Sequence, residues 1–337
     1  MDLKNKKFLL VRNDKIGDFM LIWPAISYLK KNLGNCHITC LVSKDVERLA
    51  GKCNNIDEII TDQSLANLKK IIKEKKFDAS ISFFSTFRIG YLLKSCEIPL
   101  RIAPATKMAQ FFYNHTLKQN RSQSKKPEHE YNTDLVVELL DKYQVVDFEP
   151  MDEPPYLQLD EKESRDYKRD FCNIYKINLD KKILFIHPGS GGSSKSLSID
   201  DYVAICKGLR SFDDYNFIIH HSITEKKLAS ELFNKLDKIT NVKLIRPTHN
   251  IDALLKNINL CDVFISGSTG PLHIAGALNK KTVGFFPSKR SSTHLRWETI
   301  NNSRRRLHFT DLGGRFRNIK IDENRTILEI QKFIGVS

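Results

Sequence analysis

The sequence has 337 residues, of which 41% are hydrophobic and 28% charged. This composition is typical of a globular protein and excludes a wholly disordered chain. The length predicts two domains of roughly 150 residues each. No apolar run approaches the about 18 residues of a membrane-spanning helix. The apolar run at residues 8–11 is too short for a signal peptide, so we expect a cytoplasmic protein.

The formal net charge of +14 at pH 7 suits a polyanion, an anionic membrane surface or a phosphorylated substrate as partner. A basic surface that is merely solvated explains the charge equally well, so both interpretations stay open. The seven cysteines include no Cys-x-x-Cys pair, and most stand in apolar runs. They are typical of buried free thiols rather than of a metal site.

The first half of the chain alternates short apolar runs with segments of helical periodicity. Strands are predicted at residues 8–11, 37–42, 58–60 and 79–83, and helices at 19–33, 65–75 and 88–94. Strands that alternate with helices indicate a parallel sheet covered on both faces.

The second half repeats this alternation. Strands are predicted at residues 182–186, 216–220, 242–245, 263–266 and 282–286, and helices at 200–209, 225–236, 251–257 and 271–278. A last amphipathic helix at 325–334 is a candidate to pack back across a cleft between the domains. The proline-bearing segment 148–155 is the predicted linker, which gives domains at 1–150 and 151–337. Ligands of such sheets bind at the carboxyl ends of the strands, so the loops that follow strands are the candidate sites.

The first such loop runs from Arg12 to Asp18. Gly17 permits a tight turn, and the Asp18 carboxylate then stands at a helix N-terminus. Asp18 is a candidate general base, although an acid in the first turn of a helix is also an ordinary structural feature.

The second loop, residues 187–196, carries glycines, serines and Lys195, which supply N–H donors, hydroxyls and a positive charge for a phosphate group. It matches neither the Walker A pattern nor Gly-x-Gly-x-x-Gly. A flexible surface turn is the alternative. The strand before it and the helix predicted after it favour an anion site.

The third loop, residues 266–273, follows a strand and opens a helix with Pro271 near its first position. Backbone N–H groups near Thr269 and Gly270 would point from the helix start at a diphosphate. His273 on the first turn is either a ligand-binding group or an ordinary core or capping residue. No Asp-x-Asp motif occurs in the sequence, so we expect no metal and assign the leaving-group charge to helix ends and Lys195.

The order and spacing of these loops resemble glycosyltransferase family 9, the heptosyltransferases of bacterial lipopolysaccharide cores. Residues 9–18 with Pro24-Ala25-Ile26 are similar to its first signature, Ile186-His187-Pro188-Gly189 leading to Lys195 to its second, and residues 268–278 to its third. Arg101 and the His129-Glu130 region also match in place. The resemblance spans about residues 8–300.

The resemblance implies an α/β GT-B fold of two facing, doubly wound, Rossmann-like parallel-sheet domains, the first binding the acceptor and the second the nucleotide sugar. It implies inverting transfer of a sugar, typically heptose from an ADP-heptose-like donor, to a lipopolysaccharide core acceptor, with no cofactor. The implied catalytic residues are Asp18 as the base and Lys195. The implied donor-binding residues are Ser190, Gly191, Lys195, Glu225, Ser268, Thr269, Gly270 and His273. Ser268 stands where the family carries an aspartate that contacts the donor, which leaves the donor sugar open.

The stretch from Arg88 to Lys126 is rich in basic residues, with Phe111, Phe112 and Tyr113 among them. Our hypothesis is that it binds the acceptor and seats the enzyme on the anionic inner face of the cytoplasmic membrane; a solvated basic loop is the alternative. The acceptor candidates are Arg101, Lys107, Arg121 and Lys125.

Three alternatives to heptosyl transfer were weighed, and two of them remain. The scaffold could use a different nucleotide sugar, or bind a nucleotide or phosphoglycan without turnover. Nucleic-acid binding finds no support, because no helix-turn-helix, RNP-type aromatic pattern or zinc finger occurs.

Overall fold

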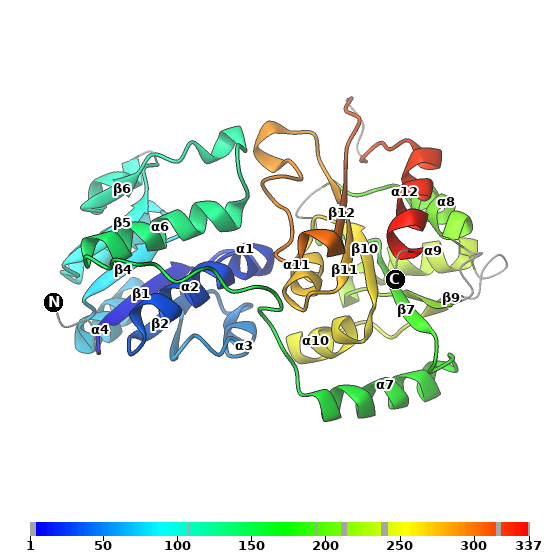
Figure 1. Cartoon of the computed structure of the whole chain (residues 1–337), viewed down its shortest axis with the longest axis horizontal. Helices are drawn as coiled ribbons and strands as arrows, with labels where there is room; N and C mark the ends of the chain where they lie inside the picture. The colour runs from blue at the N-terminus through cyan, green and yellow to red at the C-terminus, as the bar shows by residue number, and fades with distance from the viewer. Residues whose placement is uncertain are drawn as a thin grey trace. The chain divides into compact units, whose positions relative to one another are not determined.

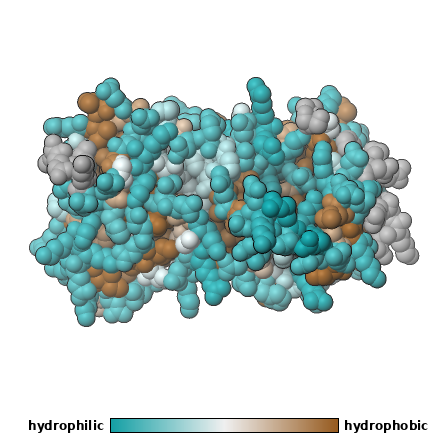
Figure 2. Space-filling view, turned by 60° about the horizontal axis from the view of Figure 1, so that its bottom comes forward, coloured by the Kyte–Doolittle hydropathy of each residue, from teal (hydrophilic) through white to brown (hydrophobic). Residues whose placement is uncertain are grey.

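The computed structural model describes residues 5–106, 108–192, 195–209, 214–236, 242–314 and 318–335. The chain divides into two compact units, Met1–Glu153 and Pro154–Ser337, each built on its own six-stranded parallel sheet (Figure 1). No helix of the described residues is both long and apolar enough to cross a membrane. On the face drawn in Figure 2, hydrophilic residues predominate and hydrophobic residues reach the surface in separate patches.

The sheet of the first unit has the strand order β3-β2-β1-β4-β5-β6. Its strands are β1 (Lys7–Arg12), β2 (His37–Val42), β3 (Glu58–Thr61), β4 (Ala79–Ser82), β5 (Leu100–Pro104) and β6 (His115–Leu117). Its helices are α1 (Ile16–Met20), α2 (Trp23–Leu33), α3 (Glu47–Ala50), α4 (Leu65–Lys75), α5 (Phe87–Ser95) and α6 (Glu128–Lys142), with 3₁₀ turns η1 (Met108–Phe112) and η2 (Arg121–Gln123).

Helices cover both faces of this sheet, which explains why β1 is an uninterrupted apolar run. Leu9 and Val11 of β1 belong to a core shared with α4 and α5. Successive side chains of a strand point to opposite faces, so Phe8 and Leu10 face the other layer, where Phe8 packs edge-on against Tyr143 at the end of α6. Arg12 has the same parity and therefore points toward α6.

The single helix predicted at residues 19–33 is two helices, α1 and α2, which meet at Leu21 and Ile22. Pro24 lies in the first turn of α2. Proline has no N–H to donate to a carbonyl four residues earlier, so one helix ends and another begins.

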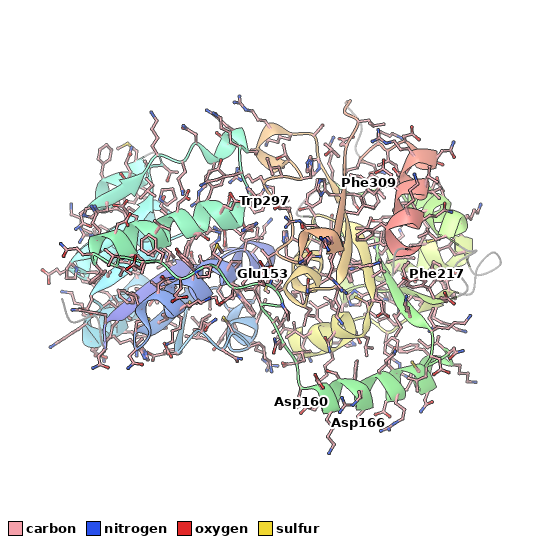
Figure 3. All side chains as sticks on the ribbon, in the orientation of Figure 1. Glu153, Asp160, Asp166, Phe217, Trp297 and Phe309 are labelled. Carbon is pink, nitrogen blue, oxygen red and sulfur yellow. The ribbon has the colours of Figure 1, made fainter. Side chains whose placement is uncertain are left out.

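The second unit repeats the topology with the strand order β12-β11-β10-β7-β8-β9. Its strands are β7 (Lys182–His187), β8 (Tyr215–Ile219), β9 (Val242–Leu244), β10 (Val263–Gly267), β11 (Lys281–Phe286) and β12 (Arg306–Thr310). Its helices are α7 (Glu161–Tyr175), α8 (Ile199–Leu209), α9 (Lys226–Leu236), α10 (Ile251–Leu260), α11 (Gly270–Ala277) and α12 (Glu323–Gly335), with 3₁₀ turns η3 (Ile223–Glu225), η4 (Arg290–Ser292) and η5 (Ser303–Arg305). Phe309 of β12, labelled in Figure 3, belongs to one edge of the sheet. Its ring stacks on that of Phe285 of β11.

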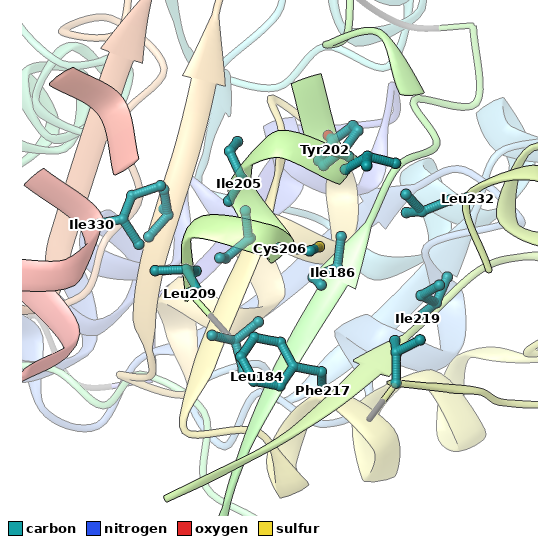
Figure 4. Packing of buried hydrophobic residues seen from close by; sticks show 14 of the residues in the cluster. Leu184, Ile186, Tyr202, Ile205, Cys206, Leu209, Phe217, Ile219, Leu232 and Ile330 are labelled. Atoms are coloured by element: carbon teal, nitrogen blue, oxygen red, sulfur yellow. The ribbon is translucent and has the colours of Figure 1, made fainter. Parts of the chain in front are cut away.

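One core of this unit lies between the sheet and helices α8, α9 and α12 (Figure 4). Leu184 and Ile186 of β7 contribute from the sheet, and Ile330 of α12 is fully buried among them. The Gln331 amide also donates to the Gly208 carbonyl, at 2.8 Å, at the end of α8. The last helix is therefore built into the core of the second unit.

Several elements were not predicted from the sequence, namely α3, β5, β6, α6, α7 and β12. In α7 the buried residues are Phe171 and Cys172, and most of the other residues are charged or polar, so few apolar residues mark this helix in the sequence although they recur at helical spacing. A capping hydrogen bond from the Glu163 N–H to the Asp160 carboxylate, at 2.8 Å, starts this helix (Figure 3). β12 is an edge strand whose five residues are all partly exposed, so it lacks the apolar run of a central strand.

Each sheet has one point where the order of its strands reverses direction. In the first unit the reversal lies between β1 and β4, and in the second between β7 and β10. Adjacent loops part there in opposite directions, and doubly wound sheets bind ligands at the carboxyl ends of these strands. The loops that follow β1, β4, β7 and β10 are therefore the candidate site positions.

Candidate functional site

A buried arginine organises the loop after β1. Arg12 is 3% exposed, and its Nε donates to Asp14 Oδ1 at 2.8 Å. Its Nη2 donates to Asp18 Oδ1 at 2.5 Å. Asp18 lies in the first turn of α1, as expected. One guanidinium therefore holds two carboxylates at the end of β1, and both of these side chains remain partly accessible to solvent.

The same arginine is linked to the start of α6 and to the end of β4. The buried Glu128 carboxylate lies 3.5 Å from Arg12 Nη1 and 2.7 Å from Arg121 Nη1. Both arginines also donate to the carbonyl of Phe83, which follows β4. Two guanidinium groups thus meet three carboxylates beside the reversal point of the first sheet, which favours a proton or another cation at this place.

The environment alters the proton affinity of two members of this network. Burial raises the pKa of Asp14 to about 6, against the opposing effect of Arg12. Burial alone would lower the pKa of Arg12, but the carboxylates of Asp14, Asp18 and Glu128 together raise it above its ordinary value. Arg12 therefore stays a cation, and the loop offers carboxylates that can accept a proton from a hydroxyl group.

Sequence reasoning singled out Asp18 and Arg121 but missed Arg12, Asp14 and Glu128. The sequence did carry a signal for Arg12. It is a charged residue at the end of an apolar strand, and it points to the same side of the sheet as the buried residues Phe8 and Leu10. The sequence did not single out Glu128: Arg121 lies only seven residues before it, but its other partner, Arg12, lies far away along the chain.

In the second unit, Glu225 joins the loop after β7 to the turn after β8. Its Oε1 accepts from Gly191 N–H at 3.0 Å, and its Oε2 accepts from Ser222 N–H at 3.0 Å and from Ser222 Oγ. A Cβ on Gly189 would lie 2.0 Å from Oε1, so only glycine admits the carboxylate here. Of the predicted donor residues, Gly191 and Glu225 are thus in direct contact, and Ser190 lies between Gly189 and Gly191.

Lys195 follows the same loop and is 39% exposed at its side chain. Its Nζ lies 3.8 Å from Asp311 Oδ2, just after β12. Asp311 is buried, and its Oδ1 accepts from the N–H groups of Gly313 and Lys320. Sequence reasoning missed Asp311, which keeps the lysine ammonium at the carboxyl edge of the sheet.

The loop after β10 opens α11 as predicted. The Thr269 hydroxyl caps the helix by accepting from Leu272 N–H at 3.4 Å, and Gly270 and Pro271 form the first turn. Ser268 is joined to β11 through its N–H, which donates to the Phe285 carbonyl at 3.1 Å. His273 is 3% exposed, which places its ring in the interior of the unit.

The proposed acceptor residues differ in what their side chains contact. Arg101 donates to the backbone carbonyls of Phe112, at 2.9 Å, and of Ile98. Arg121 lies in the network around Glu128 described above. Lys125 is exposed, and Lys107 lies outside the described residues. A role of these residues toward an acceptor stays a prediction.

The seven cysteines are all free and buried, as their apolar surroundings predicted. In the ranges that the structure describes, no group of three or more His, Cys, Asp or Glu side chains could hold a metal ion.

The comparison with known families adds to this geometry. The model of glycosyltransferase family 9 (heptosyltransferase) matches residues 65–312. The chain belongs to glycosyltransferase family 9. The match begins after the Asp18 loop. That loop is covered by a relative from Haemophilus influenzae, provisionally described as a glycosyltransferase, which is 37% identical over 98% of this chain and 97% of its own length.

Other family 9 relatives carry more specific descriptions. The lipopolysaccharide core heptosyltransferase OpsX of Haemophilus influenzae is 22% identical over 83% of this chain and 79% of its own. Lipooligosaccharide heptosyltransferase 2 of Campylobacter jejuni is 27% identical over 40% of this chain and 43% of its own.

Solved structures confirm the predicted GT-B fold of this family 9 enzyme. The E. coli ADP-heptose lipopolysaccharide heptosyltransferase II superposes with a TM-score of 0.77 at 17% identity, covering 98% of both chains. The E. coli heptosyltransferase WaaC with ADP superposes with a TM-score of 0.73 at 10% identity, covering 97% of this chain and 99% of the WaaC chain. The protein is therefore a glycosyltransferase with two doubly wound parallel sheets.

Proposed function

We propose that this family 9 glycosyltransferase transfers heptose from an ADP-heptose-type donor to a lipopolysaccharide core acceptor, with inversion and without a metal ion. Relatives described as lipopolysaccharide core heptosyltransferases, and a related fold solved with ADP, support the substrate class. The observation that carries the mechanism is the Asp18 carboxylate, held by buried Arg12 at the end of β1.

The donor belongs to the second unit in this proposal. Its diphosphate would receive hydrogen bonds from the start of α11, at Thr269 and Gly270, and from the loop around Ser190 and Gly191. Lys195 would add a positive charge as the leaving group departs. Asp311 supports this role because it holds the lysine ammonium at the same edge of the sheet. Glu225 would accept hydrogen bonds from hydroxyl groups of the nucleotide ribose.

Transfer would be a direct displacement. The acceptor hydroxyl oxygen forms a bond to the anomeric carbon while the bond from that carbon to the diphosphate oxygen breaks, and the proton passes to Asp18. The nucleoside diphosphate leaves with the electron pair on the face opposite the acceptor, so the anomeric configuration inverts. Arg12 would balance the charge of Asp18 before the proton arrives.

Ser268 favours a second candidate, a different nucleotide sugar on the same scaffold. It replaces a family aspartate that contacts the donor, and a neutral hydroxyl supplies neither the charge nor the reach of a carboxylate. Competing a panel of nucleotide sugars against ADP-heptose would distinguish the two candidates.

We further propose that the first unit rests on the anionic membrane surface that presents the acceptor. Residues 84–126 contain eight Lys or Arg residues and one acid, Glu97. Four large hydrophobic side chains of α5 and η1 are more than half exposed. They are Phe87, Tyr91, Met108 and Phe111. We call these four the exposed hydrophobic set. Apolar side chains among basic residues suit the boundary between headgroups and acyl chains.

The base assignment is tested with Asp18→Asn, which removes the proton acceptor and keeps the size of the side chain. We expect kcat to fall by about 10²–10⁴ while the affinity for ADP stays unchanged. Asp45→Asn, an exposed aspartate of the same unit, is the matched control and should retain full activity.

Transfer should be measured from ADP-heptose in excess EDTA. Near-normal kcat for Asp18→Asn would contradict the base assignment. Activity that appears only after Mg²⁺ or Mn²⁺ is added would contradict the metal-free mechanism.

A further inference from the structure

Behind Glu225, a line of polar side chains crosses one side of the second sheet. Tyr167 of α7 and Asn257 of α10 begin it, and Thr248, in the loop after β9, continues it. His220 and His187, at the ends of β8 and β7, complete it. Both histidines are nearly inaccessible, at 1% and 3% exposure. Residues from five separate elements thus reach the donor loop through one connected path.

The first links have a defined donor direction. The Tyr167 hydroxyl donates to Asn257 Oδ1 at 2.8 Å, and Asn257 Nδ2 donates to Thr248 Oγ1 at 3.3 Å. Thr248 Oγ1 lies 2.9 Å from His220 Nε2. The threonine oxygen accepts from Asn257 and still carries its own proton, for which His220 Nε2 is a hydrogen-bond partner at 2.9 Å.

This direction determines the tautomers of the two histidines. With Nε2 accepting, neutral His220 carries its proton on Nδ1, which lies 3.2 Å from His187 Nδ1. His187 then accepts at Nδ1 and carries its proton on Nε2, 3.7 Å from Glu225 Oε2. Every proton in the line faces an acceptor, and the last one faces the carboxylate.

A competing arrangement would place the His187 proton on Nδ1, facing the His220 carbonyl oxygen at 3.0 Å. Neutral His187 would then turn the lone pair of Nε2 toward the Glu225 carboxylate, which is repulsive. A second proton would remove the repulsion, but burial lowers the pKa of both His187 and His220, which opposes this. The line that ends in His187 Nε2–H in turn places the Nδ1 lone pair 3.0 Å from the His220 carbonyl oxygen, but that oxygen is the end of a neutral dipole, whereas the competing arrangement opposes a lone pair to a full negative charge. The neutral line that ends in His187 Nε2–H is therefore the favoured state.

We propose that Thr248, His220 and His187 are positioning residues that orient the Glu225 carboxylate for the ribose hydroxyls of the donor nucleotide. This rests on the proposed function, in which the donor is a nucleotide sugar. His187 and Ser222 occupy Glu225 Oε2, while Oε1 accepts from Gly191 and has a second lone pair for a ligand hydroxyl. Without His187 the carboxylate could rotate and redistribute its hydrogen bonds.

The test compares Thr248→Val, which removes the hydroxyl at similar size, with Thr248→Ser, which retains it. Calorimetry with ADP and with 2′-deoxy-ADP measures how well each protein recognises the ribose 2′-hydroxyl. The preference is the ratio of the affinity for ADP to that for 2′-deoxy-ADP. We expect this ratio to be about tenfold lower in Thr248→Val than in wild type, as for one weakened charged hydrogen bond, and unchanged in Thr248→Ser. In a Glu225→Gln background, Thr248→Val should cause no further loss.

An unchanged preference in Thr248→Val, even with a lowered Tm, would overturn the proposal and leave the line a purely structural role. Nitrogen-15 NMR of the imidazoles gives a readout that does not depend on nucleotide binding. It should show His187 protonated at Nε2 and His220 at Nδ1, with the His220 signals altered in Thr248→Val. His187 protonated at Nδ1 would overturn the proposal. A wild-type protein that binds neither nucleotide would refute the proposed function instead, and the NMR result would still decide whether the line has the inferred direction.

Discussion

Arg12 is buried beside three carboxylates. These carboxylates make the burial of its charge possible, and they in turn need a cation close to them. Moving a guanidinium out of water costs several kcal/mol, and Asp14, Asp18 and Glu128 together offset that cost. Removing Arg12 would leave Glu128 buried with Arg121 as its remaining close cation. The site and the stability of the first unit therefore depend on the same residue.

Asp14 should make the stability of the protein depend on pH. Its folded pKa of about 6 lies above the ordinary value of 3.8, so the folded state binds this proton more tightly than the unfolded state. Ionising Asp14 consequently costs stability as pH rises from about 4 through 6, by at most about 3 kcal/mol. Asp14→Asn lacks this loss, so its free energy of unfolding relative to wild type should increase over that range.

Urea unfolding at a series of pH values between 4 and 8 measures this difference. Asp45→Asn, on an exposed aspartate, should show a difference from wild type that does not change with pH. A flat difference for Asp14→Asn would show that Asp14 titrates normally in the folded protein, and a falling difference would show that Arg12 lowers its pKa instead.

At the scale of elements, Arg121 fastens η2 to the start of α6. Its Nη1 donates to Glu128 and to the Phe83 carbonyl, and its Nε donates to Gln119. The basic stretch between β4 and α6 therefore contains cations of two kinds. Some, such as Arg101 and Arg121, bind groups of the unit itself, and others, such as Lys125, are exposed.

Alanine substitutions should separate these two kinds. Arg121→Ala leaves the Glu128 carboxylate buried, and we expect a loss of about 3 kcal/mol, the low end for a broken buried pair because Arg12 remains nearby. Lys125→Ala should change the free energy of unfolding by less than about 0.5 kcal/mol. Urea denaturation of both variants tests this, and equal small effects would mean that Arg121 contributes nothing to the fold.

At the scale of the whole molecule, the distribution of charge and apolar surface bears on where the enzyme works. Reversing Lys94, Lys118 and Lys125 to Glu changes exposed cations of the stretch 84–126, which carries the exposed hydrophobic set, and spares the arginines that support the fold. We expect binding to anionic liposomes to fall and the acceptor KM to rise, more strongly at low salt, while the affinity for ADP holds. Phe111→Ser should weaken liposome binding at both salt concentrations.

Sedimentation with anionic and neutral liposomes measures this binding. The matched control reverses Lys44, Lys162 and Lys176, three exposed lysines elsewhere on the chain, and changes the net charge by the same amount. If both triple variants behave alike, net charge and not this surface governs the binding. If the wild type ignores anionic liposomes, the membrane proposal fails.

Much of the architecture follows from local pattern. Buried strands such as β1 and β7 are continuous apolar runs, because helices cover both faces of their sheets, so they could be located from the sequence. The loops after these strands could be identified as site positions for the same reason. α6 and α7 were missed although apolar residues recur in them at helical spacing, as Tyr131, Leu135 and Leu139 do in α6, because charged and polar side chains outnumber the apolar ones.

The sequence by itself determined the family, the two doubly wound units and the loops that carry Asp18, Lys195 and Thr269. Only the tertiary structure decided which charges meet, because Arg12 and Glu128, or His187 and Glu225, are joined by the order of strands and not by spacing along the chain. Strand order is set by long-range packing, which a local pattern does not encode. Burial, which raises the pKa of Asp14 and lowers that of His187, is likewise a property of the packed whole.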